Sequence, residues 1–275
     1  MNNGSMPNHS FVPDDIAARY EVFEWRNGIA ILSAAHPEKW ADILAVLRGF
    51  SFSTSDVMKP GGAKGLIASK LDSHFTQLGW AEKKFETKIV VDEAEHAAPT
   101  HKVDCYKDRV ALEVEWNNKD PFYDRDLENF KRLHADGAIS VGIIVTRGKS
   151  LQDNMRNLVG RFFDERQIQT FKDLLRWGYD PTAKQRAAIN KRMERANNPL
   201  SFREAFVDKF VSDKFGEATT HWRKLEERVS RGVGNPCPLV LIGLPDQIIT
   251  FGESEKAVKE IIANAVANES LEDIE

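Results

Sequence analysis

The chain has 275 residues, a formal net charge of −4, 41% hydrophobic residues and 29% charged residues. This length suits one large or two modest domains, and the composition excludes collagen-like, low-complexity and wholly disordered chains. No stretch approaches the ~20 consecutive apolar residues of a membrane-spanning helix, and the N-terminus lacks the basic start and apolar run of a secretory signal. We therefore expect a cytoplasmic protein without membrane contact. Cys105 and Cys237 have no metal-site spacing, and we expect both to be small buried residues.

The first part of the chain mixes strand and helix patterns. Residues 20–25 alternate like a strand, and Asn27-Gly28 is typical of a hairpin turn, so 29–33 are expected to resume the apolar strand pattern. Residues 37–49 and 66–78 then have helical spacing. Between them, residues 58–65 form a basic, glycine-rich loop that is not a Walker A motif. Two roles are possible for this loop: contact with a nucleic-acid backbone, or a plain linker between the two helices.

The middle of the chain returns to strands. Residues 83–91 are expected to be a strand and 92–101 a hydrophilic loop. Residues 102–106 and 110–116 then read as two short strands joined by a tight turn. A helix over 124–133, a buried strand over 138–146 and a helix from about 150 follow, which is the alternation of an α/β protein.

The last third is mainly helical. We expect helices over most of 164–234, a buried strand over 238–243 and a final helix over 251–270. The predicted fold is an α/β core with a mixed β-sheet flanked by helices, plus a helical insertion. Its predicted divisions are an N-terminal extension (1–19), a core (20–163 and 235–275) and the insertion (164–234).

Charge is unevenly distributed along the chain. Residues 176–195 are rich in lysine and arginine, and the last residues, from Glu253, are mainly acidic. A basic segment fits polyanion binding by one face, and it equally fits solvated helix faces. With so small a net charge, no field of the whole molecule indicates a nucleic-acid partner.

Three carboxylates carry the most chemistry. Side chains two apart on a strand share a face, so Glu113 and Glu115 lie side by side, and Asp104 can lie across from them on the neighbouring strand. Like charges crowded on a hydrophobic sheet are costly unless a cation neutralises them, which predicts a Mg2+ site. The alternative is that the glutamates lie on a solvated face of the sheet.

The segment containing these acids, residues 104–115 (DCYKDRVALEVE), closely resembles the active-site segment of the BglII/BstYI family of type II restriction endonucleases, within the PD-(D/E)XK nuclease superfamily. Weaker similarities follow in the family's order, and the resemblance covers about residues 20–162 and 235–245. It implies a restriction-endonuclease-like core. It also implies a Mg2+-dependent, site-specific deoxyribonuclease of a restriction-modification system, with Mn2+ able to replace Mg2+.

The resemblance also implies roles for the three acids. Asp104 and Glu113 would hold the metal, and Glu115 would act as a third ligand or help to deprotonate the attacking water. Glu115 departs from the glutamine usual in BglII and BstYI and resembles the BamHI pattern, which keeps an oxygen ligand and adds a negative charge. The lysine often found at this position in the superfamily is absent, and Lys88 or Lys119 could replace it.

DNA contacts are expected from three segments: the glycine-rich loop, the residues after the second catalytic strand, and the strand-to-helix junction near residue 150. Their amide, guanidinium and ammonium groups suit base edges and phosphates, although helix capping is an equal alternative. The candidates are Lys59, Lys64, Asn117, Asn118, Lys119, Arg147, Lys149, Gln152, Asn154 and Arg156.

The implied substrate is double-stranded DNA, at a palindrome with a central GATC, cut to leave 5'-phosphate ends. A palindrome requires a two-fold homodimer with one active site per strand. No nucleotide cofactor is expected. Two other functions are open: a DNA-binding protein that has lost catalysis, and a nuclease for modified or damaged DNA.

Overall fold

The structure, a computed structural model, describes residues 11–58, 65–92, 94–98, 102–119, 121–260 and 263. The chain divides into two compact units. Unit 1 comprises Met1–Phe50, Lys70–Lys149 and Thr220–Pro245, and unit 2 comprises Ser51–Ser69, Ser150–Thr219 and Asp246–Glu275. The predicted division into a core and an insertion at 164–234 uses other boundaries and stays a prediction. Within the described residues, no helix is long and apolar enough to cross a membrane.

Unit 1 is built on a six-stranded mixed sheet in the order β1-β9-β8-β7-β6-β3. The central strands β7, β8 and β9 are parallel, while β1, β6 and β3 are antiparallel to their neighbours. The predicted mixed α/β fold is confirmed. The strands of this sheet are β1 (Glu21–Trp25), β3 (Ala81–Lys83), β6 (Val103–Lys107), β7 (Val110–Glu115), β8 (Val141–Arg147) and β9 (Leu239–Leu244).

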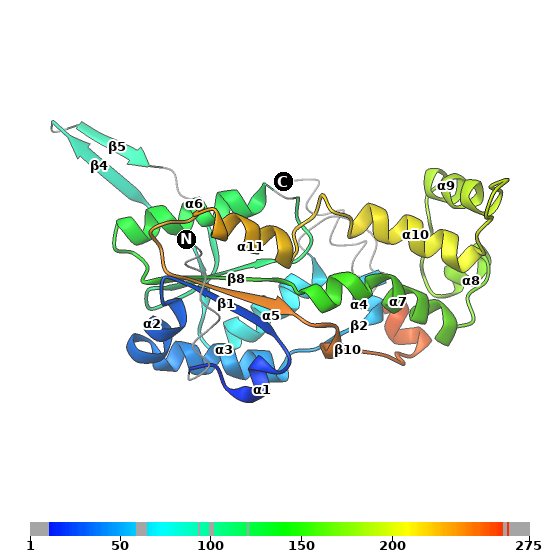
Figure 1. The fold of residues 1–275 in the computed structure, drawn as a ribbon, viewed down its shortest axis with the longest axis horizontal. Coiled ribbons are helices and arrows are strands. Elements are labelled where there is room, and N and C mark those ends of the chain that lie inside the picture. Colours follow the sequence, from blue (N-terminus) through cyan, green and yellow to red (C-terminus); the bar gives the residue numbers. More distant parts are fainter. Residues whose placement is uncertain are drawn as a thin grey trace. The chain divides into compact units, whose positions relative to one another are not determined.

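Helices cover both faces of this sheet, with α6 and α11 on one side and α2 and α3 on the other (Figure 1). Every residue of β7, β8 and β9 is buried, as expected for parallel strands covered on both faces. The helices of unit 1 are α1 (Asp14–Ala17), α2 (Gly28–Ala35), α3 (Pro37–Gly49), α6 (Phe122–Ala135), α11 (Trp222–Ser230) and most of α5 (Leu66–Gln77).

Helix α6 lies against β7 and β8 through an apolar stripe. Tyr123, Leu127, Phe130 and Leu133 recur at helical spacing and are buried with Ala111 and Ile144 of the strands. Gly142 permits the close approach, since a Cβ there would lie 2.4 Å from the Phe130 ring. The start of α6 is therefore held directly over the C-terminal half of β7.

Two local predictions are wrong. Residues 29–33 belong to helix α2 and not to a second strand; both Arg26 and Asn27 have positive φ, and the turn they make leads into a helix packed on β9. A short apolar run does not distinguish a strand from a buried helix. The predicted loop at 92–101 contains β5 (Ala94–Ala98), which pairs with β4 (Thr87–Val91) as a separate antiparallel ribbon. Alanine and glutamate are poor strand formers, so pairing with β4 overrides their propensity.

Unit 2 is mainly helical, as predicted for much of 164–234. Its core is aromatic: Phe163 and Phe206 have ring centroids 4.7 Å apart, and Tyr179 and Phe210 each lie 5.6 Å from Phe206. Its elements are β2 (Phe52–Ser53), α4 (Thr54–Met58), α7 (Lys149–Glu165, from its second residue), α8 (Phe171–Arg176), α9 (Ala183–Met193), α10 (Phe202–Lys214), the 3-10 helix η1 (Asp246–Ile248) and β10 (Ile249–Thr250). Residues 255–260 are also helical.

Candidate active site

Asp104 and Glu113 face each other across β6 and β7. The antiparallel register pairs Cys105 with Leu112, so the next pair along is Asp104 and Glu113. The backbone N–H of Asp104 donates to Glu113 Oε2 at 3.2 Å, and the N–H of Val114 donates to Asp104 Oδ2 at 3.3 Å. Each carboxylate is thus held by the backbone of the opposite strand. The two residues predicted to hold the metal are brought together.

Glu115 lies two residues further along β7, on the same face as Glu113. Both glutamates are almost fully buried, at 2% and 3% exposure, because α6 covers this face of the sheet. Glu115 Oε2 accepts a hydrogen bond from Asn118 Nδ2 at 2.6 Å, and Glu115 Oε1 lies 3.7 Å from Arg125 Nη2. The alternative that the glutamates lie on a solvated face of the sheet does not describe this structure.

A fourth carboxylate, Asp126 of α6, joins these three and was not predicted. It is 1% exposed, and its Oδ1 accepts from Arg125 Nε and Nη2, each at 2.8 Å. Asp126 is three residues after Tyr123 and four before Phe130, on the apolar stripe of the helix. An acid on that stripe, in the helix directly after the predicted catalytic strand, was the sequence signal for it.

Two oxygens of this cluster have no hydrogen-bond partner among the described residues: Glu113 Oε1 and Asp126 Oδ2, both buried. A buried carboxylate oxygen without a donor is costly and calls for a proton or a cation. Carboxylate oxygens are the ligands that Mg2+ and Ca2+ prefer. The residues present therefore fit a hard divalent cation by donor type and by their unsatisfied oxygens.

The electrostatics of the cluster agree with this interpretation. Burial, followed by the charges of Asp126 and Asp104, raises the pKa of Glu113 well above its ordinary value. Burial and the charge of Asp126 raise the pKa of Glu115 to about 9. The pKa of Asp126 is also raised, chiefly by burial. Without a cation, burial and mutual repulsion therefore disfavour the ionised form of each of these side chains.

The arrangement is not a closed coordination shell. Among the described residues, no group of three or more histidine, cysteine, aspartate or glutamate side chains is positioned to hold a metal ion. Asp104 and Glu113 engage backbone N–H groups, and Glu115 engages Asn118. Cation binding at this cluster therefore requires the carboxylates to turn from these partners toward one point.

A comparison with known protein families shows which family the chain belongs to. Residues 20–244 match the family described as restriction endonuclease BglII/BglIII. The chain belongs to this family. The match spans both units and most of the chain, and it confirms the family and the fold class predicted from the sequence. No individual curated protein matches the sequence. Membership of the BglII/BglIII family makes the chain a type II DNA endonuclease, hence a hydrolase that acts on DNA.

Among the predicted DNA-reading residues of this BglII/BglIII family member, Asn118 supports the cluster. Besides its side-chain bond to Glu115, its backbone N–H donates to Thr220 Oγ1 at 3.0 Å, and its carbonyl accepts from the Thr220 N–H at 2.8 Å. Asn117 Oδ1 is buried without a hydrogen-bond partner, whereas Lys119 is exposed. Of these three residues, Lys119 is the one that faces solvent.

Arg147 and Lys149 lie in unit 1, at the end of β8 and just after it. Arg147 is fully buried, and its Nη2 donates to the Thr220 carbonyl at 2.6 Å. As placed, it supports the loop before α11, and its predicted contact with DNA has no support here. The backbone N–H of Lys149 donates to the Glu21 carboxylate, and its Nζ lies 3.4 Å from Glu226.

Three further candidates lie on α7 in unit 2. Gln152 Nε2 donates to the Phe215 carbonyl and Asn154 Nδ2 to Asp246 Oδ2, so both side chains fix neighbouring segments. Arg156 is exposed, with Asp208 3.6 Å away. Lys59 and Lys64 lie outside the described residues. The predicted roles of all these residues in DNA binding stay predictions.

Proposed function

We propose that the protein is a Mg2+-dependent, sequence-specific endonuclease of double-stranded DNA, with Asp104, Glu113 and Glu115 as its catalytic carboxylates. Family membership supports the DNA endonuclease activity. The observation that carries the site is the pair of facing carboxylates on β6 and β7, in which the buried Glu113 Oε1 has no hydrogen-bond donor. Mn2+ is proposed as a substitute for Mg2+, since it shares the preference for oxygen ligands.

In this proposal Asp104 and Glu113 hold the cation. When bound, the cation lowers the pKa of the attacking water and offsets charge on the scissile phosphate and the leaving 3' oxygen. Glu115 either completes the ligand set or accepts a proton from the water, and Asn118 orients its carboxylate in both cases. Attack on phosphorus breaks the bond to the 3' oxygen, which gives a 5'-phosphate and a 3'-hydroxyl.

No lysine occupies the position that lysine often takes in the superfamily, because Glu115 stands there. Lys88 on β4 and Lys119 after β7 are both exposed. The proposal therefore assigns no lysine to activation of the attacking water. Because Glu115 is negatively charged when ionised, whereas a lysine at this position would be positively charged, the site depends more strongly on a bound cation.

The proposed substrate is a palindrome containing GATC, cut by a homodimer in the cytoplasm without a nucleotide cofactor. The support for this part is the resemblance of residues 104–115 to BglII and BstYI, together with family membership. A two-fold dimer would present one copy of the carboxylate cluster to each strand.

The test is incubation of the purified protein with unmethylated plasmid DNA in Mg2+, in Mn2+ and in EDTA, followed by sequencing of the fragment ends. Discrete, metal-dependent fragments that share an end sequence are expected, and D104N or E113Q should abolish them while DNA binding persists. Wild-type cleavage rates in both variants would overturn the site assignment. Tight binding without any cleavage would favour a protein that has lost catalysis, and cleavage confined to methylated or damaged DNA would favour the other alternative.

A further inference from the structure

Asp126 is the one residue of the carboxylate cluster to which the proposed function gives no task. It comes from α6, whereas Asp104, Glu113 and Glu115 come from the sheet. Its side chain is 1% exposed and lies on the stripe that packs α6 onto β7 and β8. An apolar residue would fill this position at lower cost, because burying a carboxylate among other carboxylates is unfavourable.

Arg125 fixes one oxygen of Asp126 and leaves the other available. Nε and Nη2 of Arg125 both lie 2.8 Å from Asp126 Oδ1, and Nη2 is also 3.7 Å from Glu115 Oε1. One guanidinium nitrogen therefore links the carboxylates of Asp126 and Glu115. The guanidinium itself stacks on Phe122, 4.4 Å from the ring centroid, which restricts its position.

The second oxygen, Asp126 Oδ2, is buried and has no hydrogen-bond partner among the described residues. The same Arg125 Nη2 that holds Asp126 Oδ1 at 2.8 Å places Glu115 of β7 beside it, with Glu115 Oε1 3.7 Å from that nitrogen. Asp126 Oδ2, from the helix, and Glu113 Oε1, from the sheet, are the two buried carboxylate oxygens of this cluster that have no hydrogen-bond partner among the described residues.

An ordinary structural role does not account for this oxygen. Asp126 does not cap α6, whose N-cap is Pro121, and it is not a surface partner of Arg125, since its carboxylate is almost fully buried. Pairing with Arg125 uses only Oδ1, so it does not explain the burial of Oδ2. A group that supplies positive charge to Oδ2 completes the arrangement.

We propose that Asp126 is a fourth carboxylate of the cation site and binds the divalent cation through Oδ2, while Arg125 holds Oδ1. This inference rests on the proposed function, because it assigns a further residue to the same site. With Asp126, the ligands come from three elements, β6, β7 and α6, so that the cation ties the helix to the sheet. The carboxylates must turn toward one another for this, since they do not form a closed shell as they stand.

The test is equilibrium binding of Mn2+ to the metal-free full chain, followed by the electron paramagnetic resonance signal of free Mn2+. The variant is D126N, which keeps the shape of the side chain and removes its charge. The matched control is D124N, two residues earlier on the same helix, where Asp124 is exposed and pairs with Arg228 at 3.2 Å. We expect D126N to raise the dissociation constant at least about tenfold and D124N to leave it within about twofold.

Thermal unfolding of the same proteins separates ligand loss from misfolding. In EDTA at pH 8, D126N should melt at or above the wild-type temperature, because it removes a buried like charge. Saturating Mn2+ should then raise the melting temperature of the wild type more than that of D126N. Equal Mn2+ affinity in D126N and wild type would overturn the inference.

Mn2+ binding by E113Q shows whether a negative result with D126N contradicts only the role of Asp126 or the whole proposed site. If E113Q weakens Mn2+ binding and D126N does not, the site stands and Asp126 is not a ligand. If neither variant weakens binding, or if the wild type binds no Mn2+ at millimolar concentration, both the proposed site and this inference are wrong.

Discussion

The central feature at the scale of single residues is a group of acidic side chains buried together with too little positive charge nearby to balance them. Glu113, Glu115 and Asp126 are each at most 3% exposed, and only one arginine, Arg125, is ion-paired with them in the described part of the chain. Such a group is satisfied either by protons or by a cation. Its protonation state therefore couples the stability of the protein to pH and to divalent metal.

The first prediction concerns this coupling at Glu115, whose pKa is raised from 4.5 to about 9. Between these two pH values the unfolded chain has lost the proton that the folded chain retains, so the metal-free protein loses stability as pH rises. Below pH 4.5 both states are protonated and this loss is absent. Urea unfolding in EDTA should show the stability of the wild type falling relative to E115Q by about 4 kcal/mol between pH 6 and pH 9, since the folded chain retains one more proton over most of that interval.

Added Mg2+ provides the control for that experiment. Because the cation binds the ionised carboxylates, saturating Mg2+ should remove most of the difference in pH dependence between the wild type and E115Q. Parallel stability curves for the two proteins in EDTA would show that Glu115 ionises normally in the folded protein, which contradicts the prediction.

The second prediction concerns Asn118, a positioning residue for Glu115. Its amide donates to Glu115 Oε2 at 2.6 Å, and this bond opposes the burial that raises the pKa of Glu115. N118A should therefore raise that pKa further, and the pH at which cleavage activity rises should shift upward. A pH–rate profile measures the shift, and N118D, which keeps the shape but replaces the donating NH2 group by a carboxylate oxygen and adds a negative charge, should shift it in the same direction. A lower rate with an unchanged profile would indicate loss of structure only.

At the scale of elements, the sequence predicts the two strands that carry Asp104, Glu113 and Glu115 well because their signals are local. The residues of β6 and β7 carry an alternating pattern on either side of a short turn, and the run in β8 is β-branched and buried. The carboxylate pair follows from that pairing. Asp126 has a local signal, an acid on the apolar stripe of α6, but its approach to the β7 carboxylates depends on how α6 packs onto the sheet, as at the Gly142–Phe130 contact, and the sequence pattern alone does not show that packing.

The two elements that were predicted wrongly, α2 and β5, also depend on contacts between distant parts of the chain. Helix α2 has an apolar run that suits a strand equally well, and only its packing on β9 determines which forms. Strand β5 has weak strand propensity and exists through its pairing with β4. In both, contacts between distant parts of the chain outweigh the preference of the segment itself.

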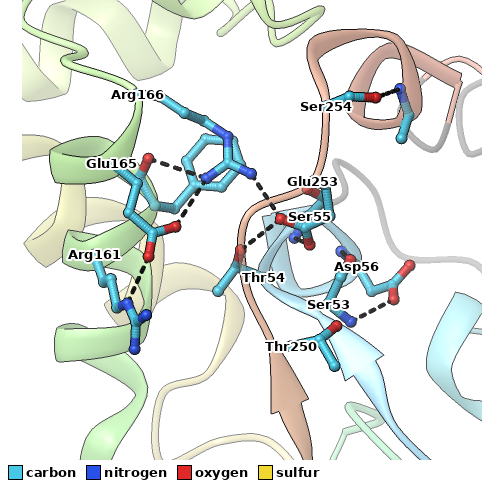
Figure 2. Close-up of polar contacts among 12 residues, drawn as sticks. Ser53, Thr54, Ser55, Asp56, Arg161, Glu165, Arg166, Thr250, Glu253 and Ser254 are labelled. Carbon is cyan, nitrogen blue, oxygen red and sulfur yellow. Dashed lines mark hydrogen bonds and ion pairs between the residues drawn. The ribbon is translucent and has the colours of Figure 1, made fainter.

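The third prediction tests how unit 2 holds the segment after β10. Figure 2 shows Arg166 of the segment following α7 reaching Glu253, 2.7 Å away, whose carboxylate also accepts from Thr54 Oγ1 and the Ser55 N–H. Arg166 is 3% exposed and Glu253 12% exposed, and the guanidinium lies 4.1 Å from the Phe162 ring centroid. E253A leaves the buried Arg166 with the more distant Glu165, 3.6 Å away, as its remaining carboxylate partner, so it should lower the free energy of unfolding by about 2 kcal/mol, less than for a charge left wholly unpaired.

An exposed ion pair of the same unit is the control. Asp180, which is 70% exposed, pairs with Arg186, so D180A should cost less than about 1 kcal/mol. Burial opposes ionisation of Glu253, but hydrogen bonds from Ser53 and Ser55 and from Arg166 outweigh it and lower its pKa. The stabilisation it provides is therefore present at neutral pH and lost as pH falls through that lowered pKa. Equal costs for the two variants would refute this account of the pair.

At the scale of the whole molecule, DNA binding must overcome a net charge of −4. No general field attracts the phosphate backbone, so local groups of cations have to supply the attraction. The basic segment predicted from the sequence includes α9, where Arg192 is paired with Asp208 at 2.9 Å. Lys184, Lys191 and Arg195 of that segment are exposed; Lys184 and Lys191, seven residues apart, share one face of α9, and Arg195 lies two residues beyond its end.

The last prediction is that these three residues contact the DNA backbone. Each phosphate contact contributes about 0.9 to the slope of log K against log salt concentration, so K184A/K191A/R195A should reduce the slope by roughly 2 to 3. Phosphate contacts carry no sequence information, so the ratio of specific to non-specific affinity should change little. The control, K131A/R132A/R231A, removes the same charge from residues that already pair with a glutamate three or four positions earlier in the chain, and its slope should match the wild type. Equal slopes for all three proteins would show that the face of α9 is solvated in the complex, and a slope lost equally in both variants would show that net charge alone sets the salt dependence.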